Sequence, residues 1–95
     1  MTVVTKEISA ENTWSDPINV KGRFDLSISG TFSATVTVQR SFDGGSSWAA
    51  VDTFTAPIET FGEQPSYATY RVGVATGDYT SGTVTVSLIE EDLSD

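Results

Sequence analysis

The sequence predicts an all-β domain, and three observations lead to this prediction. Val, Ile and Thr together number 29 of the 95 residues, whereas Leu numbers only 3, and β-branched side chains fit a pleated strand better than a helix. Several segments alternate apolar and polar residues, and Gly or Pro separates them. The length suits one core, so we expect a single antiparallel β-sandwich, immunoglobulin-like or jelly-roll-like, of about seven to eight strands.

The first third of the chain contains two predicted strand regions. Residues 2–9 mix Thr and Val as a first strand, and a polar connection that contains Trp14 follows. Pro17 begins the next segment, and Gly22 interrupts it. The apolar residues of 24–28 then alternate with Asp and Ser at a strict period of two, which indicates a strand with one buried face.

The middle of the chain contains a predicted hairpin. Gly30 separates the preceding strand from residues 32–38, whose alternation of Phe, Ala and Val with Ser and Thr is the clearest strand pattern in the sequence. A return strand is predicted over 48–55, and Pro57 ends its pairing because proline has no amide hydrogen to donate. We expect residues 56–68, which contain two prolines, to form a long surface connection or a poorly formed edge strand.

The last third contains two further predicted strands. Residues 69–74 and 83–88 each place apolar side chains at alternate positions, and TGDYTSG at 76–82 predicts a wide turn between them. We assign the sandwich to residues 1–89. Residues 90–95 contain four acids and are expected to form a solvated tail, with docking on a basic partner as the alternative.

The composition excludes several functional classes. The sequence has no cysteine and no histidine, which excludes disulfides, thiolate chemistry, histidine-activated nucleophiles and the common nitrogen- or sulfur-ligated zinc sites. A net charge of −8 opposes binding to nucleic acid and to anionic membranes. No segment approaches the ~20 apolar residues that span a bilayer, and no signal-peptide pattern is present, so we expect a cytoplasmic product.

The acidic residues do not form a recognisable metal or reaction site. Asp43, Asp52 and Asp78 lack the dense carboxylate spacing of a calcium loop. Glu59, Glu63 and Asp78 offer carboxylate pairs, but any acidic chain offers such pairs, and nothing places them across a cleft. We expect no metal, no cofactor and no enzymatic activity.

The segment SFDGGSSW at 41–48 is the most distinctive in the chain. Asp43 is suited to accept hydrogen bonds from amides of its own loop, Gly45 to adopt a positive φ, and Ser41 to cap the strand end. Trp48 then falls on the return strand, where an indole would remove about 200 Å² of apolar surface from water. The pattern predicts a structural turn with Trp48 in the core.

Ser41, Asp43, Gly45 and Trp48 resemble the Asp-box hairpin found in the blades of sialidases and related glycan-active proteins, and in β-rich extracellular and viral proteins. In such proteins the box usually stabilises a turn away from the active site, so the resemblance implies a structural role. A sialidase would also need repeated boxes on a propeller and an arginine cluster with a catalytic tyrosine, which a single domain of this size does not supply.

A second resemblance covers residues 28–88. The segments ISGTFSATVTVQRSFDGGSSWAAVDTF and YRVGVATGDYTSGTVTVSL are similar to small proteins from the structural gene clusters of tailed bacteriophages. This resemblance implies a virion component, made in the host cytoplasm without a signal peptide, whose partners are the major capsid protein or other virion proteins.

Trp14, Tyr79 and Arg71 are candidates for contact with a partner or a glycan. Trp14 and Tyr79 lie outside clear strands, where exposed rings either stack on a sugar or contact a protein. Arg71 either pairs with an acid on a neighbouring strand or projects to a partner, and the cross-strand acid is favoured.

We therefore expect a non-enzymatic structural protein of a bacteriophage virion, most favourably a capsid decoration or cement protein on the outer head lattice. A symmetric particle favours a homo-oligomer, with a trimer first among the closed rings. The alternatives are a carbohydrate-binding module or an adhesion module associated with the tail or neck.

Overall fold

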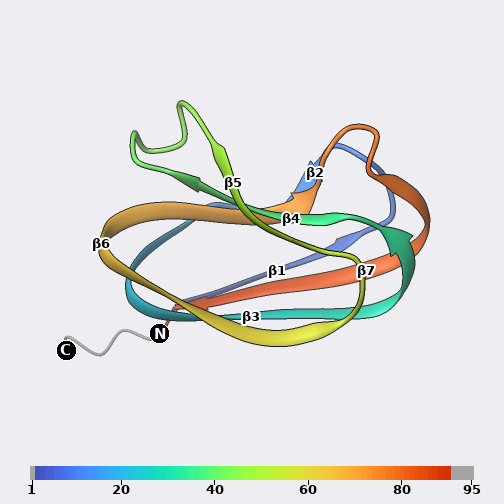
Figure 1. Cartoon of the computed structure of the whole chain (residues 1–95), viewed down its shortest axis with the longest axis horizontal. Coiled ribbons are helices and arrows are strands. Elements are labelled where there is room, and N and C mark those ends of the chain that lie inside the picture. Colours follow the sequence, from blue (N-terminus) through green and yellow to red (C-terminus); the bar gives the residue numbers. More distant parts are fainter. Residues whose placement is uncertain (1, 91–95) are drawn as a thin grey trace.

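The computed structural model describes residues 2–90 and consists of strands joined by turns (Figure 1). The strands are β1 (Thr2–Ile8), β2 (Thr13–Trp14), β3 (Ile18–Ala34), β4 (Val36–Ser41), β5 (Ala49–Phe54), β6 (Ile58–Val74) and β7 (Tyr79–Glu90). Every strand pair is antiparallel. Within residues 2–90, no helix is long and apolar enough to cross a membrane. The predicted all-β class is confirmed.

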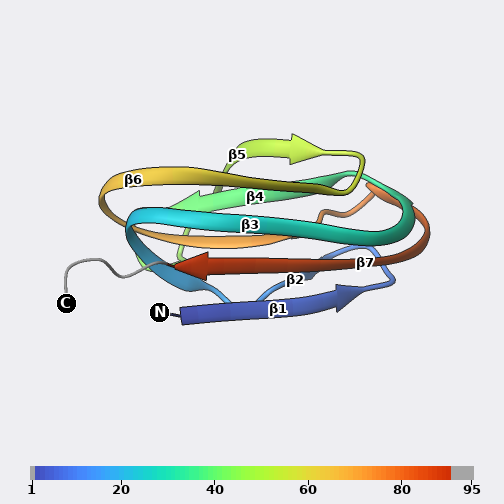
Figure 2. The same ribbon diagram turned by 90° about the horizontal axis from the view of Figure 1, so that it is seen from below.

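The strands form one continuous sheet that folds over into two packed layers. The strand order is β1–β7–β3–β6–β4–β5, and β2 pairs with β6 off this path. The β1–β7 layer contains β1, β7, the later part of β3 and the first part of β6, which lie side by side in Figure 2. The β4–β5 layer contains β2, the start of β3, the last part of β6, β4 and β5, and forms the upper part of Figure 1. This arrangement is the single antiparallel β-sandwich that the sequence predicts.

The two 17-residue strands, β3 and β6, each belong to both layers. Residues 18–20 of β3 pair with 68–70 of β6 in the β4–β5 layer, whereas 22–28 pair with 58–64 in the β1–β7 layer. The register shifts just before Gly22, whose φ is +96°. Glycine adopts this conformation without the steric cost of a Cβ, so the strand bends there and remains paired on both sides of the bend.

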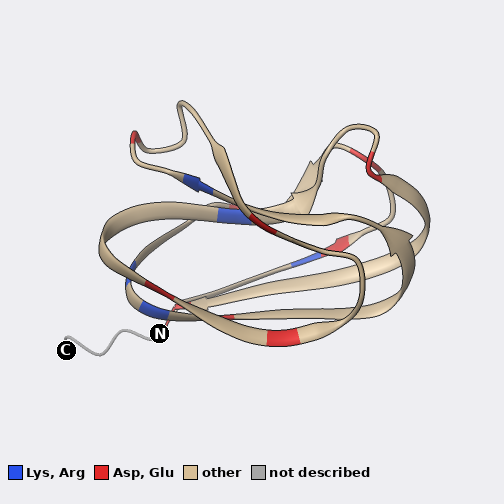
Figure 3. Ribbon diagram, viewed as in Figure 1, with Lys and Arg blue, Asp and Glu red and all other residues tan. Residues whose placement is uncertain are grey.

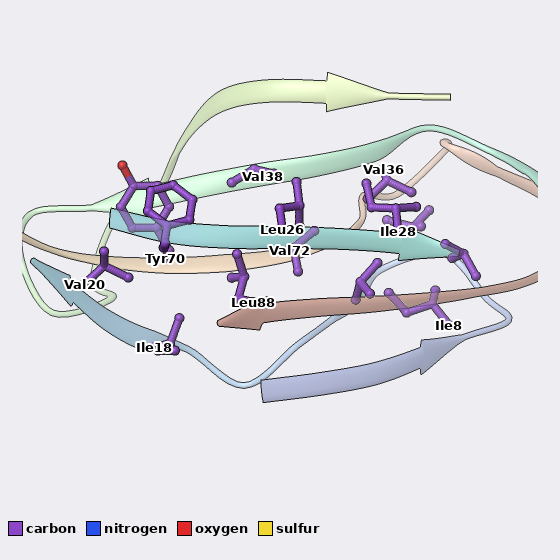
Figure 4. Packing of buried hydrophobic residues seen from close by; sticks show 14 of the residues in the cluster. Ile8, Ile18, Val20, Leu26, Ile28, Val36, Val38, Tyr70, Val72 and Leu88 are labelled. Atoms are coloured by element: carbon purple, nitrogen blue, oxygen red, sulfur yellow. The ribbon is translucent and has the colours of Figure 1, made fainter. Parts of the chain in front are cut away.

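The core lies between the layers and consists of the inward side chains of both. Figure 4 shows Leu26, Ile28 and Leu88 of the β1–β7 layer packed with Val36, Val38 and Val72 of the β4–β5 layer. The buried hydrophobic residues are Ile8, Ile18, Val20, Phe24, Leu26, Ile28, Val36, Val38, Ala68, Tyr70, Val72, Val74, Val84, Val86 and Leu88. Full burial of each Val, Leu or Ile side chain contributes about 1.5–3 kcal/mol, so this alternation stabilises the sandwich.

The predicted strand break at Gly30 is wrong, because β3 continues to Ala34. Gly30 has φ +109°, and a Cβ there would lie 2.4 Å from the backbone oxygen of Thr83. The glycine therefore allows β7 to approach β3 closely. The chain turns instead at Thr35, which separates β3 from β4.

Of the two expectations for 56–68, the long connection is wrong, because β6 begins at Ile58, whereas the edge strand agrees with the pairing of residues 58–64 with β3 alone. Pro65 lies where β6 passes between layers, so its missing amide hydrogen interrupts no regular ladder. The start of β6 pairs with β3, and Gly62 leaves room for the Phe24 ring, whose Cζ would lie 2.6 Å from a Cβ at that position.

Two smaller differences concern the connections. The expected polar connection around Trp14 contains the short strand β2, and the wide turn expected over 76–82 is shorter because β7 begins at Tyr79. Glu90, assigned to the tail, is the last residue of β7. The rest of the predicted tail, 91–95, lies outside the described residues.

Candidate binding site on the outer face of the β4–β5 layer

The β4–β5 layer carries a cluster of large side chains on its outer face. In Figure 1, the turn over 41–48 and the connection between β6 and β7 project from opposite ends of this layer to the same side. Tyr70 and Val72 face the core, so Arg71, between them on β6, faces outward. Trp14 and Trp48 lie against this arginine.

Hydrogen bonds within the 41–48 turn hold its backbone in place. Ser41 is 1% exposed, and its hydroxyl accepts a hydrogen bond from the Gly45 amide at 2.8 Å and donates to Asp43 Oδ1 at 2.6 Å. Asp43 also accepts hydrogen bonds from the amide and hydroxyl of Ser47. Donors from Ser41 and then Ser47 stabilise the charged carboxylate and hold the pKa of Asp43 well below its usual range.

Two consecutive glycines direct the return of the chain toward Arg71. Gly44 and Gly45 have φ values of +73° and +102°, which favour glycine. A Cβ on Gly45 would lie 3.4 Å from Cζ2 of Trp48. The turn therefore places the Trp48 indole beside Gly45, at the edge of the β4–β5 layer.

Arg71 contacts both indoles. Its Cζ atom is 4.3 Å from the ring centroid of Trp14 and 4.4 Å from that of Trp48. Both distances are short enough for a cation–π contact, so the guanidinium interacts with both indoles. The Arg71 Nε group donates to Gln39 Oε1 at 2.8 Å across the β4–β6 pair, which fixes the plane of the guanidinium.

Gly73 makes the position of Trp14 possible. It pairs with Trp14 across β2 and β6, and a Cβ on Gly73 would lie 2.7 Å from the Trp14 Cα and 2.8 Å from its Cε3. The absence of a side chain lets the indole lie over β6. The Ser15 hydroxyl accepts a hydrogen bond from the Val72 amide at 3.1 Å, which holds the segment after β2 against β6.

The geometry corrects two expectations about this cluster. Trp48 is half-buried on the outer face and is not part of the core between the layers. The cross-strand partner of Arg71 is the neutral Gln39, not an acid. Partial burial lowers the pKa of Arg71, although arginine remains charged at neutral pH.

Tyr79 lies apart from this cluster. Its ring packs against the core, and its hydroxyl donates to the Gly82 carbonyl oxygen at 2.8 Å. The structure thus brings together Trp14 and Arg71, two of the three predicted contact residues, adds Trp48 from the turn, and leaves Tyr79 out.

The outer face of the β1–β7 layer carries a second feature, which the sequence analysis missed. Val3, Ile89, Asp25 and Phe61 are register neighbours in one row across β1, β7, β3 and β6. Val3 is 51% exposed and Phe61 is 58% exposed. The Arg23 guanidinium lies 4.3 Å from the centroid of the Phe61 ring. In the sequence, Phe61 interrupts the polar pattern of its segment, but the two prolines of residues 56–68 favour a connection or an edge strand and do not predict an apolar row.

The carboxylates do not form a compact group within residues 2–90, where no three acidic side chains lie close enough to hold a metal ion. Figure 3 shows acidic positions distributed over strands and loops. Glu59 lies on the β1–β7 layer and accepts a hydrogen bond from Ser27, whereas Asp78 lies in the turn before β7.

These features define a small all-β sandwich whose distinctive side chains lie on the outer faces of its two layers. No protein-family model matches the sequence, and neither the search of curated proteins nor the search of solved structures found a match.

Proposed function

We propose that the protein is a non-enzymatic structural component of a bacteriophage virion, most favourably a capsid decoration or cement protein that binds the outer head lattice. The resemblance of residues 28–88 to small phage structural proteins supports this role. The observation on which the proposal depends is the apolar row of Val3, Ile89 and Phe61 across the β1–β7 layer, in which Val3 and Phe61 are exposed.

This row has the character of a protein-binding surface. It crosses four neighbouring strands and spans about 14 Å at the usual strand spacing. A shallow depression of about 340 Å³ adjoins it, lined in part by Phe61, Ile89, Asp25 and Glu59. The apolar side chains lie beside charged groups of both signs, the Arg23–Asp25 pair and Glu59, and therefore suit a partner surface that combines apolar and polar groups.

The small size of the row favours binding as an oligomer. One row offers a limited apolar contact, whereas several copies on a symmetric ring bind a symmetric lattice with much higher avidity. We therefore propose a homotrimer, or another closed ring, formed in solution or on the particle. Analytical ultracentrifugation of the free protein and of protein released from particles measures this directly.

The decisive experiment compares two exposed phenylalanines. Phe61 is in the proposed docking row, and Phe42 is 68% exposed on the 41–48 turn with Arg40 4.9 Å from its ring centroid. We expect Phe61→Ser to weaken binding to phage particles that lack the protein by at least about tenfold, and Phe42→Ser to leave binding unchanged. Equal effects of the two changes, or absence of the protein from purified particles by mass spectrometry, would refute the proposal.

A carbohydrate-binding or tail- and neck-associated adhesion module is the second candidate. The observation that favours it is the pair of indoles gathered with Arg71 on one face. Arg71 covers one face of each ring, so a sugar would stack on the remaining faces. A glycan array tests this role, and retention of binding after Trp14→Ala, or no binding to any glycan, would exclude it.

A further inference from the structure

We infer that the stack formed by Trp14, Arg71 and Trp48 is a binding site for a carboxylate, presented by an Asp or Glu side chain or a C-terminus of a partner protein. The site lies on the outer face of the β4–β5 layer, whereas the proposed lattice-binding row lies on the β1–β7 layer. The inference therefore does not depend on the proposed function, and it gives the protein a second, chemically different contact surface.

The hydrogen bonds of Arg71 leave its terminal donors available. A guanidinium has five N–H donors in a rigid fork, and Nε uses one of them on Gln39. Among the described residues, neither Nη group has a hydrogen-bond acceptor. A ligand that approaches in the plane of the guanidinium meets two parallel N–H groups, which match the two oxygens of a carboxylate.

The charge of Arg71 is not neutralised by its neighbours. The protein has thirteen acidic and five basic residues, yet the ion pair found within residues 2–90 joins Arg23 to Asp25 instead. The register partner of Arg71 on β4 is the neutral Gln39. Partial burial removes some of the water that stabilises the charge of the Arg71 guanidinium. A carboxylate that binds there replaces this lost hydration with an ion pair.

The site is held in its binding geometry before a ligand arrives. Gln39 fixes the plane of the guanidinium, the 41–48 turn positions Trp48, and the missing side chain of Gly73 positions Trp14. An arginine held by its neighbours loses little side-chain freedom on binding. The planar fork of the guanidinium matches the two oxygens of a planar carboxylate.

The experiment uses the full chain and two isosteric probes. N-acetyl-glutamate methylamide carries a carboxylate, and N-acetyl-glutamine methylamide carries a neutral amide of the same shape. Both tryptophans of the protein belong to the stack, so tryptophan fluorescence reports on the site. The Arg71 Nε–Hε signal in ¹⁵N NMR spectra reports on the guanidinium. Sodium chloride at equal ionic strength controls for screening.

We expect the glutamate probe to cause saturable changes in both signals at millimolar concentrations and the glutamine probe to cause none. Arg71→Lys keeps the charge but loses the planar fork, and should weaken binding by about tenfold or more. Arg40→Lys, on the neighbouring strand β4, is the matched control and should leave binding unchanged. Equal responses to the two probes, no response of the wild-type protein, or unchanged binding by Arg71→Lys would overturn the inference.

Discussion

Replacement of Ser41 by alanine tests whether the 41–48 turn depends on one buried hydroxyl. Ser41 is 1% exposed, and its Oγ accepts a hydrogen bond from the Gly45 amide at 2.8 Å. In the Ser41→Ala variant this partly buried amide has no acceptor, which costs about 2 kcal/mol. For a domain of this size, that loss lowers Tm by roughly 8–16 °C.

Urea unfolding monitored by far-UV circular dichroism and by tryptophan fluorescence measures this loss. The fluorescence of the folded variant should also change, because Gly45 lies beside the Trp48 indole. Ser46 is exposed in the same turn, and Ser46→Ala is expected to remain within about 0.5 kcal/mol of the wild type. The reasoning fails if Ser41→Ala is as stable as the wild type, or if the two variants lose equal stability.

Three further predictions concern pH, the core and the glycines. Hydrogen bonds lower the pKa of Asp43 from its ordinary value of 3.8, so they stabilise the fold above about pH 4, and this contribution is lost as the pH falls further. The wild type should therefore have a higher urea midpoint than Asp43→Asn at neutral pH, and this difference should shrink in acid. A difference that stays constant with pH would contradict the prediction. Leu88 is fully buried, and Leu88→Ala should lower the free energy of unfolding by about 3 kcal/mol, whereas a loss below about 1 kcal/mol in urea titrations would show that the site collapses. Gly30 and Gly22 both have positive φ, but of the two only Gly30 would place a Cβ against a backbone atom, the Thr83 oxygen. Thermal unfolding should therefore show Gly30→Ala to be less stable than Gly22→Ala by at least about 1 kcal/mol. The opposite order of stability would contradict the predicted clash.

The inward faces of the strands could be predicted from the sequence because burial follows a local period of two. The apolar residues of 24–28, 70–74 and 84–88 are buried as their alternation predicts. The segment 32–38 shows the limit of this signal. Phe32 and Ala34 belong to β3, whereas Val36 and Val38 belong to β4 in the other layer. Both layers face the same core, so the alternation continues in phase through the corner.

The candidate binding site could be predicted only as separate residues. Trp14 meets Arg71 because β2 pairs with β6 in the register Trp14↔Gly73. The alternation of apolar residues specifies the buried face of each strand, but it does not specify which residues of two distant strands lie opposite each other. The expectation of an acid opposite Arg71 had the same cause, since the register alone places Gln39 there. The SFDGGSSW motif predicted a turn, but it did not show which layer the Trp48 indole would cover.

The pairing of β1 with β7 has a consequence for how the protein folds. Their register runs from Thr2↔Glu90 to Ile8↔Val84, so the first strand meets its partner only across nearly the whole chain. Such a high contact order predicts slow folding, because a large loop must close before its contacts form. During synthesis, the first strand therefore remains without its partner until the last strand has left the ribosome.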